Sequence, residues 1–210
     1  PSLANFTFFI EDSRGCTTAS DTITKECLCG TDAGSLNNTD ITLCEGENYN
    51  PVFPDNYTLD AGDGFIYYLY DGSPDSIGTI ILETTTFPIN YIPAFAGKQF
   101  FITRVVGKLL PGGGIDLTDE CTDITQGVSV SWTQKPNINV ILEPFYCEGN
   151  SIVLNIENVI NGQLDIFINQ SNPVTVNPGI NAVTLDNSNV KNGDILSYSF
   201  TDDFGCLYDI

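Results

Sequence analysis

Short runs of alternating or continuous apolar residues, separated by turn residues, cover most of the chain. No stretch of a dozen residues repeats apolar positions at the i, i+3, i+4 and i+7 spacing of an amphipathic helix. Runs of this kind are typical of β-strands, and they predict an all-β protein built of Ig-like β-sandwiches. The predicted strands are Phe6 to Ile10, Phe65 to Tyr70, Thr79 to Leu82, Gln99 to Val106, Gly127 to Trp132, Ile152 to Ile156, Leu164 to Ile168, Ala182 to Leu185 and Ile195 to Thr201.

Strong turn formers stand between these runs. Residues 71–74 read Asp-Gly-Ser-Pro, residues 111–114 read Pro-Gly-Gly-Gly, and Asn161 and Asn192 each precede a glycine. Glycine and asparagine tolerate the backbone angles of tight hairpins. The composition agrees with the pattern, because 21 Thr and 20 Asn supply strand and turn residues while good helix formers are few.

Two distant segments align without a gap at an offset of 190 residues. Residues 8–16 and 198–206 both run from an aromatic-x-apolar strand into an acidic turn and then into Gly-Cys. A second pair, residues 43–48 and 146–150, shares Cys-Glu-Gly. Modules are therefore expected to open near Cys-Glu-Gly and to close near Gly-Cys. The alternative is two unrelated hairpins that share ordinary turn chemistry.

This pattern divides the chain into three parts. Residues 28–136 are predicted to form one complete Ig-like β-sandwich, and residues 137–210 a second one whose last strand is incomplete. Residues 1–27 are expected to be the terminal strands of a preceding module, or strands donated to a neighbouring subunit. The chain is thus interpreted as a piece of a longer tandem array, stapled by disulfides.

Seven cysteines in a chain without histidine favour disulfides in an oxidising compartment over metal binding. A sandwich disulfide usually joins an early strand of one sheet to a late strand of the other. This rule predicts that Cys44 pairs with Cys121 and that Cys147 pairs with Cys206.

The remaining cysteines are Cys16, Cys27 and Cys29. Cys16 is the counterpart of Cys206 in the repeat, so its partner is expected before Pro1. Cys27 and Cys29 are expected to bond each other or to clip the joint between modules. A zinc site at this pair is disfavoured, because zinc would need two further ligands and the chain has no His.

The charge balance excludes several classes of partner. The chain carries 27 acidic and 7 basic residues, a net charge of −20. Nucleic acids and anionic membranes are poor partners for it, because both require clustered Lys and Arg. No apolar run approaches the length that spans a bilayer, so no membrane insertion is expected. The absence of His removes the usual general base and the Ser-His-Asp triad, and no enzyme activity is predicted.

Acidic loops suggest one cofactor, calcium, in a chain otherwise expected to need none. Asp60 and Asp63 share one short loop, and Asp116 and Asp119 share another. Clustered carboxylates are the oxygen ligands that Ca²⁺ prefers, although neither loop matches the EF-hand pattern. The alternative is that all four are solvated turn acids.

Glycans are considered in two roles. Exposed aromatic residues could stack on surface sugars, and the candidates are Tyr67, Tyr68, Tyr70, Tyr91 and Trp132. The alternative places these rings in the core, where alternation puts half of any strand. Sequons for N-glycosylation are present at Asn5, Asn37, Asn56 and Asn169.

The strand-acid-x-x-Gly-Cys endings, the Cys-Glu-Gly openings and the Gly-Gly-Gly-Ile-Asp-Leu-Thr-Asp-Glu-Cys segment ending at Cys121 resemble modules of very large repetitive surface proteins of Bacteroidota. The flavobacterial gliding adhesins and the Ig-like arrays of Saprospiraceae-type bacteria are the families concerned. The resemblance implies secretion to the cell surface by the type IX route. It also implies a role in adhesion, gliding or filament formation, without catalytic residues.

The expected function is that of a structural repeat unit of a secreted cell-surface adhesin or extracellular filament. Its partners would be copies of itself in an array or filament, with surface glycans as further partners. The alternative is a carbohydrate- or ligand-binding module of a secreted multidomain protein.

Overall fold

The computed structural model describes residues 3–6, 9–11, 13–15, 17–19, 23–26, 29–36, 39–142, 151–157, 159, 161–186, 190–191 and 193–210. This part of the chain contains seventeen β-strands and a single 3₁₀ turn, η1 (Pro93–Phe95), which confirms the predicted all-β fold. The chain forms two compact units, each described by itself below. The first comprises Pro1–Ile41, Tyr49–Ile89 and Gln99–Val130, and the second comprises Thr42–Asn48, Asn90–Lys98 and Ser131–Ile210.

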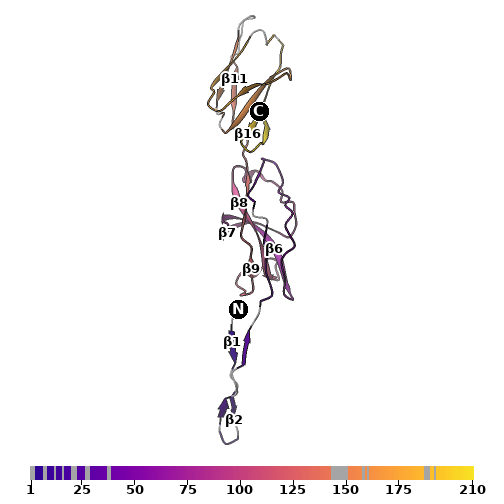
Figure 1. Ribbon diagram of the computed structural model, residues 1–210, viewed down its shortest axis with the longest axis vertical. Helices are drawn as coiled ribbons and strands as arrows, with labels where there is room; N and C mark the ends of the chain where they lie inside the picture. Colours follow the sequence, from indigo (N-terminus) through magenta and orange to yellow (C-terminus); the bar gives the residue numbers. More distant parts are fainter. Residues whose placement is uncertain are drawn as a thin grey trace. The chain divides into compact units, whose positions relative to one another are not determined.

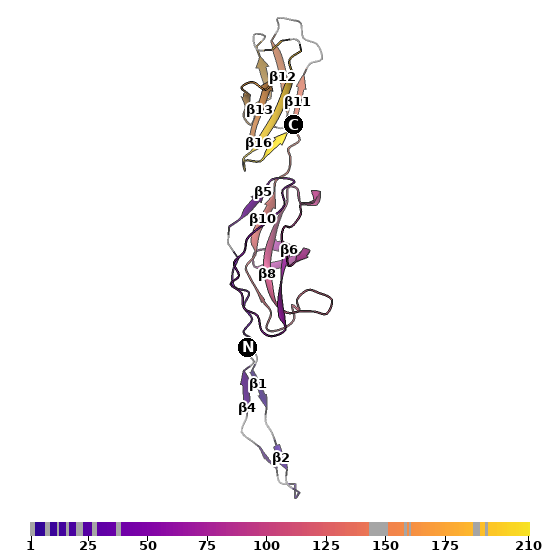
Figure 2. The ribbon, with the colours of Figure 1, turned by 90° about the vertical axis from the view of Figure 1, so that its right-hand side faces the viewer.

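The N-terminal strands form a ribbon of two antiparallel pairs, visible in Figures 1 and 2. Strand β1 (Leu3–Phe6) pairs with β4 (Ile23–Glu26), and β2 (Phe9–Glu11) pairs with β3 (Thr17–Ala19). These four strands are called the N-terminal ribbon below. Among the described residues, each pair makes a sheet of two strands only.

A larger antiparallel sheet organises the first unit (Figure 2). Its order is β5-β10-β8-β6-β7, and β9 pairs with β8. Strand β8 is central, and all its residues from Phe100 to Gly107 are buried, as expected for a strand covered on both faces. The bounds are β5 (Ile41–Leu43), β6 (Asp63–Ser73), β7 (Ser76–Thr84), β8 (Gln99–Lys108), β9 (Asp123–Ile124) and β10 (Val128–Trp132).

Each face of this sheet has its own covering layer. Tyr68, Tyr70 and Val105 lie in a cluster with Ile115, against which the β7 side chain of Ile77 packs. On the other face, Tyr67 of β6 stacks on Phe53, with ring centroids 5.4 Å apart. The second layer on that face comes from the segment between residues 30 and 62, which contains a single short strand.

The second unit contains a sandwich of two antiparallel sheets (Figure 1). One sheet has the order β11-β12-β15 and the other β14-β13-β16-β17. Leu154 and Ile156 of β12 meet Leu164 and Ile166 of β13 in a common core with Phe200 of β16. The bounds are β11 (Asn139–Leu142), β12 (Ile152–Glu157), β13 (Gly162–Ile168), β14 (Val174–Val176), β15 (Ala182–Leu185), β16 (Leu196–Asp202) and β17 (Leu207–Asp209).

Arg104, in the middle of β8, is fully buried and joins the sheet to the covering segment. Its Nε and Nη2 donate to the Ala33 carbonyl at 2.9 and 2.6 Å, and its Nη1 donates to the Pro54 carbonyl at 2.8 Å. Nη2 also donates to Asn56 Oδ1 at 2.6 Å, while the guanidinium lies 4.8 Å from the centre of the Tyr57 ring. The charge is thus solvated by neutral oxygens and an aromatic face, which is the arrangement a buried cation requires.

Replacing Arg104 by Met keeps the side-chain volume but leaves the carbonyls of Ala33 and Pro54 without their donor. We expect R104M to lower the free energy of unfolding of the first unit by about 3 kcal/mol, as for other broken buried polar networks. The matched control is K108M on the same strand, whose side chain is exposed. Denaturant titration followed by circular dichroism measures both, and equal effects of the two variants would contradict the role given to Arg104.

Candidate functional site

Two disulfides are present, and their pairing differs from the prediction. Cys29 bonds Cys121, and Cys44 bonds Cys206, with Cα atoms 5.3 and 5.4 Å apart. The predicted pairs Cys44 with Cys121 and Cys147 with Cys206 are therefore wrong. The sandwich rule assumed that each bridge lies within a single module, whereas Cys44 follows β5 and still belongs to the second unit.

Local contacts explain why Cys29 meets Cys121. Two hydrogen bonds hold the segment that follows Cys29: the Gly30 amide donates to Asp60 at 2.9 Å, and the Ala33 amide donates to Asp123 Oδ2 at 2.8 Å. The second bond lies two residues beyond Cys121, so it brings both sulfurs to the same edge of the first unit.

Cys16, Cys27 and Cys147 lie outside the described residues, and the pairing expected for them stays a prediction.

The second disulfide lies in a polar cluster that we call the clamp: Cys44, Glu45, Thr133, Cys206 and Tyr208. The Thr133 hydroxyl donates to Cys206 Sγ at 3.5 Å, accepts the Glu45 amide at 3.3 Å and shares a short hydrogen bond with the Tyr208 hydroxyl. Burial raises the pKa of Tyr208, so its hydroxyl stays protonated at neutral pH. The clamp is therefore a dry, fully connected polar contact around a covalent bond.

Lys135 and Leu43 extend the clamp along the backbone. The Thr133 amide donates to the Leu43 carbonyl at 2.9 Å, and the Lys135 amide donates to Glu45 Oε2 at 2.5 Å. Lys135 Nζ also donates to the Asp209 carbonyl. Every segment of the clamp is thus held to another by at least one hydrogen bond besides the disulfide.

The aromatic residues proposed as a sugar platform are core residues instead. Tyr67, Tyr68, Tyr70 and Trp132 are each less than a tenth exposed, and the Tyr91 hydroxyl is buried. Trp132 Nε1 donates to the Glu47 carbonyl at 2.9 Å, and its ring lies 4.8 Å from that of Phe95. The prediction of a sugar platform is wrong, because both faces of the central sheet are covered and strand alternation leaves no exposed face.

The aspartates proposed for calcium accept hydrogen bonds from their own surroundings. Asp60 Oδ2 accepts the Gly30 amide and Asp63 Oδ2 accepts the Thr31 hydroxyl at 2.5 Å. Asp116 accepts the amide and the hydroxyl of Thr118 at 3.0 and 2.6 Å, which holds the pKa of its carboxyl below the ordinary value.

Asp119 likewise accepts the Cys121 amide at 2.9 Å. Within the described ranges no three His, Cys, Asp or Glu side chains gather as metal ligands would. Calcium binding by Asp60, Asp63, Asp116 and Asp119 stays a prediction, and these contacts match the alternative of turn acids.

Two sequon asparagines have internal roles. Asn56 Nδ2 donates to the Ser35 hydroxyl at 2.8 Å while its oxygen accepts from Arg104. Asn169 Nδ2 donates to Asp194 at 2.6 Å, so in both residues the nitrogen that would carry a glycan is engaged. Asn5 lies in β1, and Asn37 lies outside the described residues.

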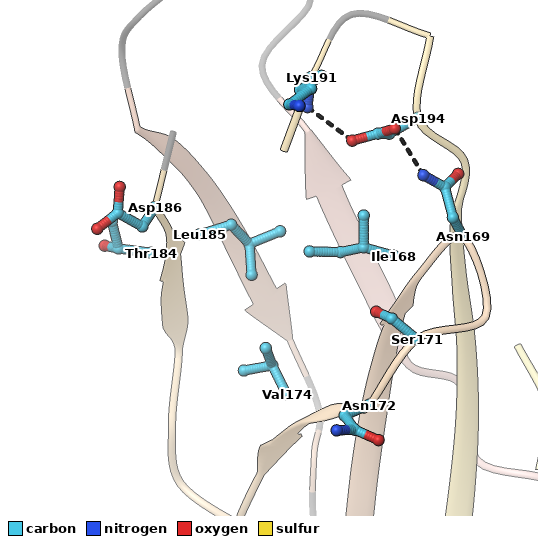
Figure 3. A pocket seen from close by; sticks show the side chains of 10 residues that line it. All are labelled: Ile168, Asn169, Ser171, Asn172, Val174, Thr184, Leu185, Asp186, Lys191 and Asp194. Carbon is cyan, nitrogen blue, oxygen red and sulfur yellow. Dashed lines mark hydrogen bonds between the residues drawn. The ribbon is translucent and has the colours of Figure 1, made fainter. Parts of the chain in front are cut away.

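One open groove, of about 750 Å³, lies at the end of the second sandwich (Figure 3). The side chains of Ile168, Val174 and Leu185 point into its centre, and Lys191, Asp194 and Asn169 stand at its rim. The groove offers amide and hydroxyl groups over an apolar floor, a chemistry that suits a polyhydroxylated ligand. Its full lining is Ile168, Asn169, Ser171, Asn172, Val174, Thr184, Leu185, Asp186, Lys191 and Asp194.

Asp194 holds the rim of the groove in place. Its two carboxylate oxygens accept the Lys191 amide and Asn169 Nδ2, each at 2.6 Å, and these bonds lower the pKa of the carboxyl. Asn169 in turn accepts the Ile195 amide at 2.9 Å and adopts a positive φ of 50° in the β13–β14 turn. Sequence reasoning missed this contact because its partners are 25 residues apart.

The depressed pKa of Asp194 predicts a pH dependence of stability. A carboxyl whose pKa is lower in the folded state stabilises the fold above its unfolded pKa and loses that contribution as the pH falls through the folded pKa. We expect D194N to melt at a lower temperature than the native chain at pH 7, and the two melting curves to converge toward pH 3. The control is D203N, an exposed aspartate of the same unit, and a difference that persists at pH 3 would contradict this role.

No family model matches the chain, and no curated protein sequence matches it. No helix in the described part of the chain is long and apolar enough to cross a membrane.

Proposed function

We propose that this chain is a structural repeat unit of a secreted cell-surface adhesin or extracellular filament, which carries tensile force without catalysis. The single observation that carries the proposal is the Cys44–Cys206 disulfide, which spans 162 residues. Disulfides persist in oxidising compartments, and the net charge of −20 keeps a long surface protein solvated.

The covalent connections decide which part of the chain would bear force. The shortest covalent route from Pro1 to Ile210 follows the backbone to Cys44, crosses the disulfide to Cys206 and continues to the end. The 162 residues between these cysteines are thereby removed from the route, together with the sandwich of the second unit. Cys29–Cys121 adds nothing to this shortening, because Cys44 lies 15 residues after Cys29 and is reached first.

This route predicts an asymmetry between the two disulfides under force. Removing Cys44–Cys206 leaves the 92-residue bridge as the only shortcut, so the fully extended chain gains the difference between 162 and 92 residues. At about 3.4 Å per residue that gain is roughly 240 Å. Single-molecule stretching of C44A/C206A measures it. C29A/C121A is the matched control and is expected to reach the same length as the native chain.

The biological role is tested by retention on cells under flow. Antibody against the chain should label intact, unpermeabilised source cells, and cells carrying C44S/C206S should detach at lower shear than cells carrying C29S/C121S. A chain found only inside the cells, or equal detachment of the two double variants, would overturn the proposal.

The groove of the second sandwich supports the alternative, a carbohydrate- or ligand-binding module. Ser171, Asn172 and Thr184 line it and would contact such a ligand. Glycan binding by a monomeric chain that weakens in N172A, with cell retention unaffected by either disulfide, would favour this alternative.

A further inference from the structure

The β2–β3 hairpin of the N-terminal ribbon and the β16–β17 hairpin of the second unit have the same register. In the first, Ile10 lies opposite Thr18 and Glu11 opposite Thr17. In the second, Phe200 lies opposite Tyr208 and Thr201 opposite Leu207. Adding the 190-residue sequence offset to each pair of the first hairpin gives a pair of the second.

The turns of the two hairpins share their backbone signature. Gly15 and Gly205, which stand 190 residues apart, have positive φ angles of 80° and 86°. In the C-terminal turn, Asp202 Oδ1 accepts the amides of Phe204 and Cys206 at 2.9 and 2.8 Å. The sequence has Asp12 at the position equivalent to Asp202.

The surroundings of the two hairpins differ. Strand β16 lies between β17 and β13, and seven residue pairs join it to β13, from Gly162 opposite Asp202 to Ile168 opposite Leu196. Phe200, Cys206 and Tyr208 are buried by this arrangement. Within the described ranges β2 and β3 pair only with each other.

A two-stranded hairpin gains little stability alone in water, and it leaves two strand edges open to pairing. The alternation in the ribbon also matches that of a strand in a sheet. The sequence places Phe6, Phe8 and Ile10 at the positions of Leu196, Tyr198 and Phe200, whose side chains are partly or fully buried in the second unit. The ribbon thus carries an apolar series that a solvated hairpin would not need.

We propose that the N-terminal ribbon is the closing hairpin of a further sandwich of the same type as that of the second unit. In this complex β2 lies antiparallel to a strand equivalent to β13, with Ile10 opposite the counterpart of Leu164. The partner is a sandwich that lacks its own last hairpin and presents an open edge strand with buried apolar residues at the positions of Leu164 and Ile166. The recognition is β-strand addition, with main-chain pairing for affinity and the apolar series for register.

A hairpin exchange within the full-length chain tests this fit. Residues 196–209 are replaced by the sequence of residues 6–19, which keeps a cysteine at position 206 and Gly at 205. We expect the second unit to fold, the bond from Cys44 to position 206 to appear in a non-reducing peptide map, and the melting temperature to fall by less than about 10 °C. The matched control inserts residues 5–18 at the same place, a one-residue shift that turns the apolar series to the opposite face.

Loss of folding in both chains, or equal folding of both, would overturn the proposal. Light scattering of the unmodified chain distinguishes the partner: a monomer is expected, because its only known acceptor strand, β13, is occupied by β16. Oligomers that disappear on Ile10→Asp would identify a second copy as the partner and overturn the choice of a separate sandwich. Neither readout depends on cell retention, so this proposal and the mechanical role can fail separately.

Discussion

The buried guanidinium of Arg104 is the constraint on which the first unit depends. A charge in a dry interior is tolerated only when fixed polar groups replace its water, and here those groups are the carbonyls of Ala33 and Pro54 and the amide of Asn56. These oxygens belong to a segment that has almost no strand pairing of its own, apart from the bridge between Asp32 and Thr58. The segment is therefore ordered by the cation and the cation is solvated by the segment, so neither is stable alone.

This mutual dependence bears on the proposed mechanical role. The shortest covalent route between the ends of the chain passes from Cys29 to Cys44, and Ala33 and Ser35 on that route both accept hydrogen bonds from Arg104. Tension along the route would pull on the carbonyls that solvate a buried charge. Extending this segment would leave a buried cation without partners, which is costly, so the segment should resist extension until the first unit opens. Beyond Cys44 the route is a covalent bond, and resistance there no longer depends on packing.

The sequence was sufficient for the strands and insufficient for what joins them. Runs such as residues 99–106 and 164–168 have the local pattern of strands, and they are strands. The disulfide pairs were wrong because pairing depends on which segments meet in space, and the contact of Ala33 with Asp123 spans 90 residues. Arg104 was counted among the scattered cations, although its place inside the apolar run Phe-Phe-Ile-Thr-Arg-Val-Val was a usable signal. A charge in the middle of a central strand must be buried and must therefore have partners.

The 190-residue echo shows where turn chemistry stops explaining a repeat. The structure gives Asp, Gly and Cys local reasons: Asp202 accepts two amides of its turn, Gly205 adopts a positive φ, and Cys206 is bonded to Cys44. Any two hairpins with such turns could share the first two residues by convergence. Convergence of turns does not account for the alternating apolar series of residues 6–10, since a turn places no demand on residues so far from it. A strand that packs against a sheet does place that demand, which is why the ribbon is better understood as part of a sandwich than as a free hairpin.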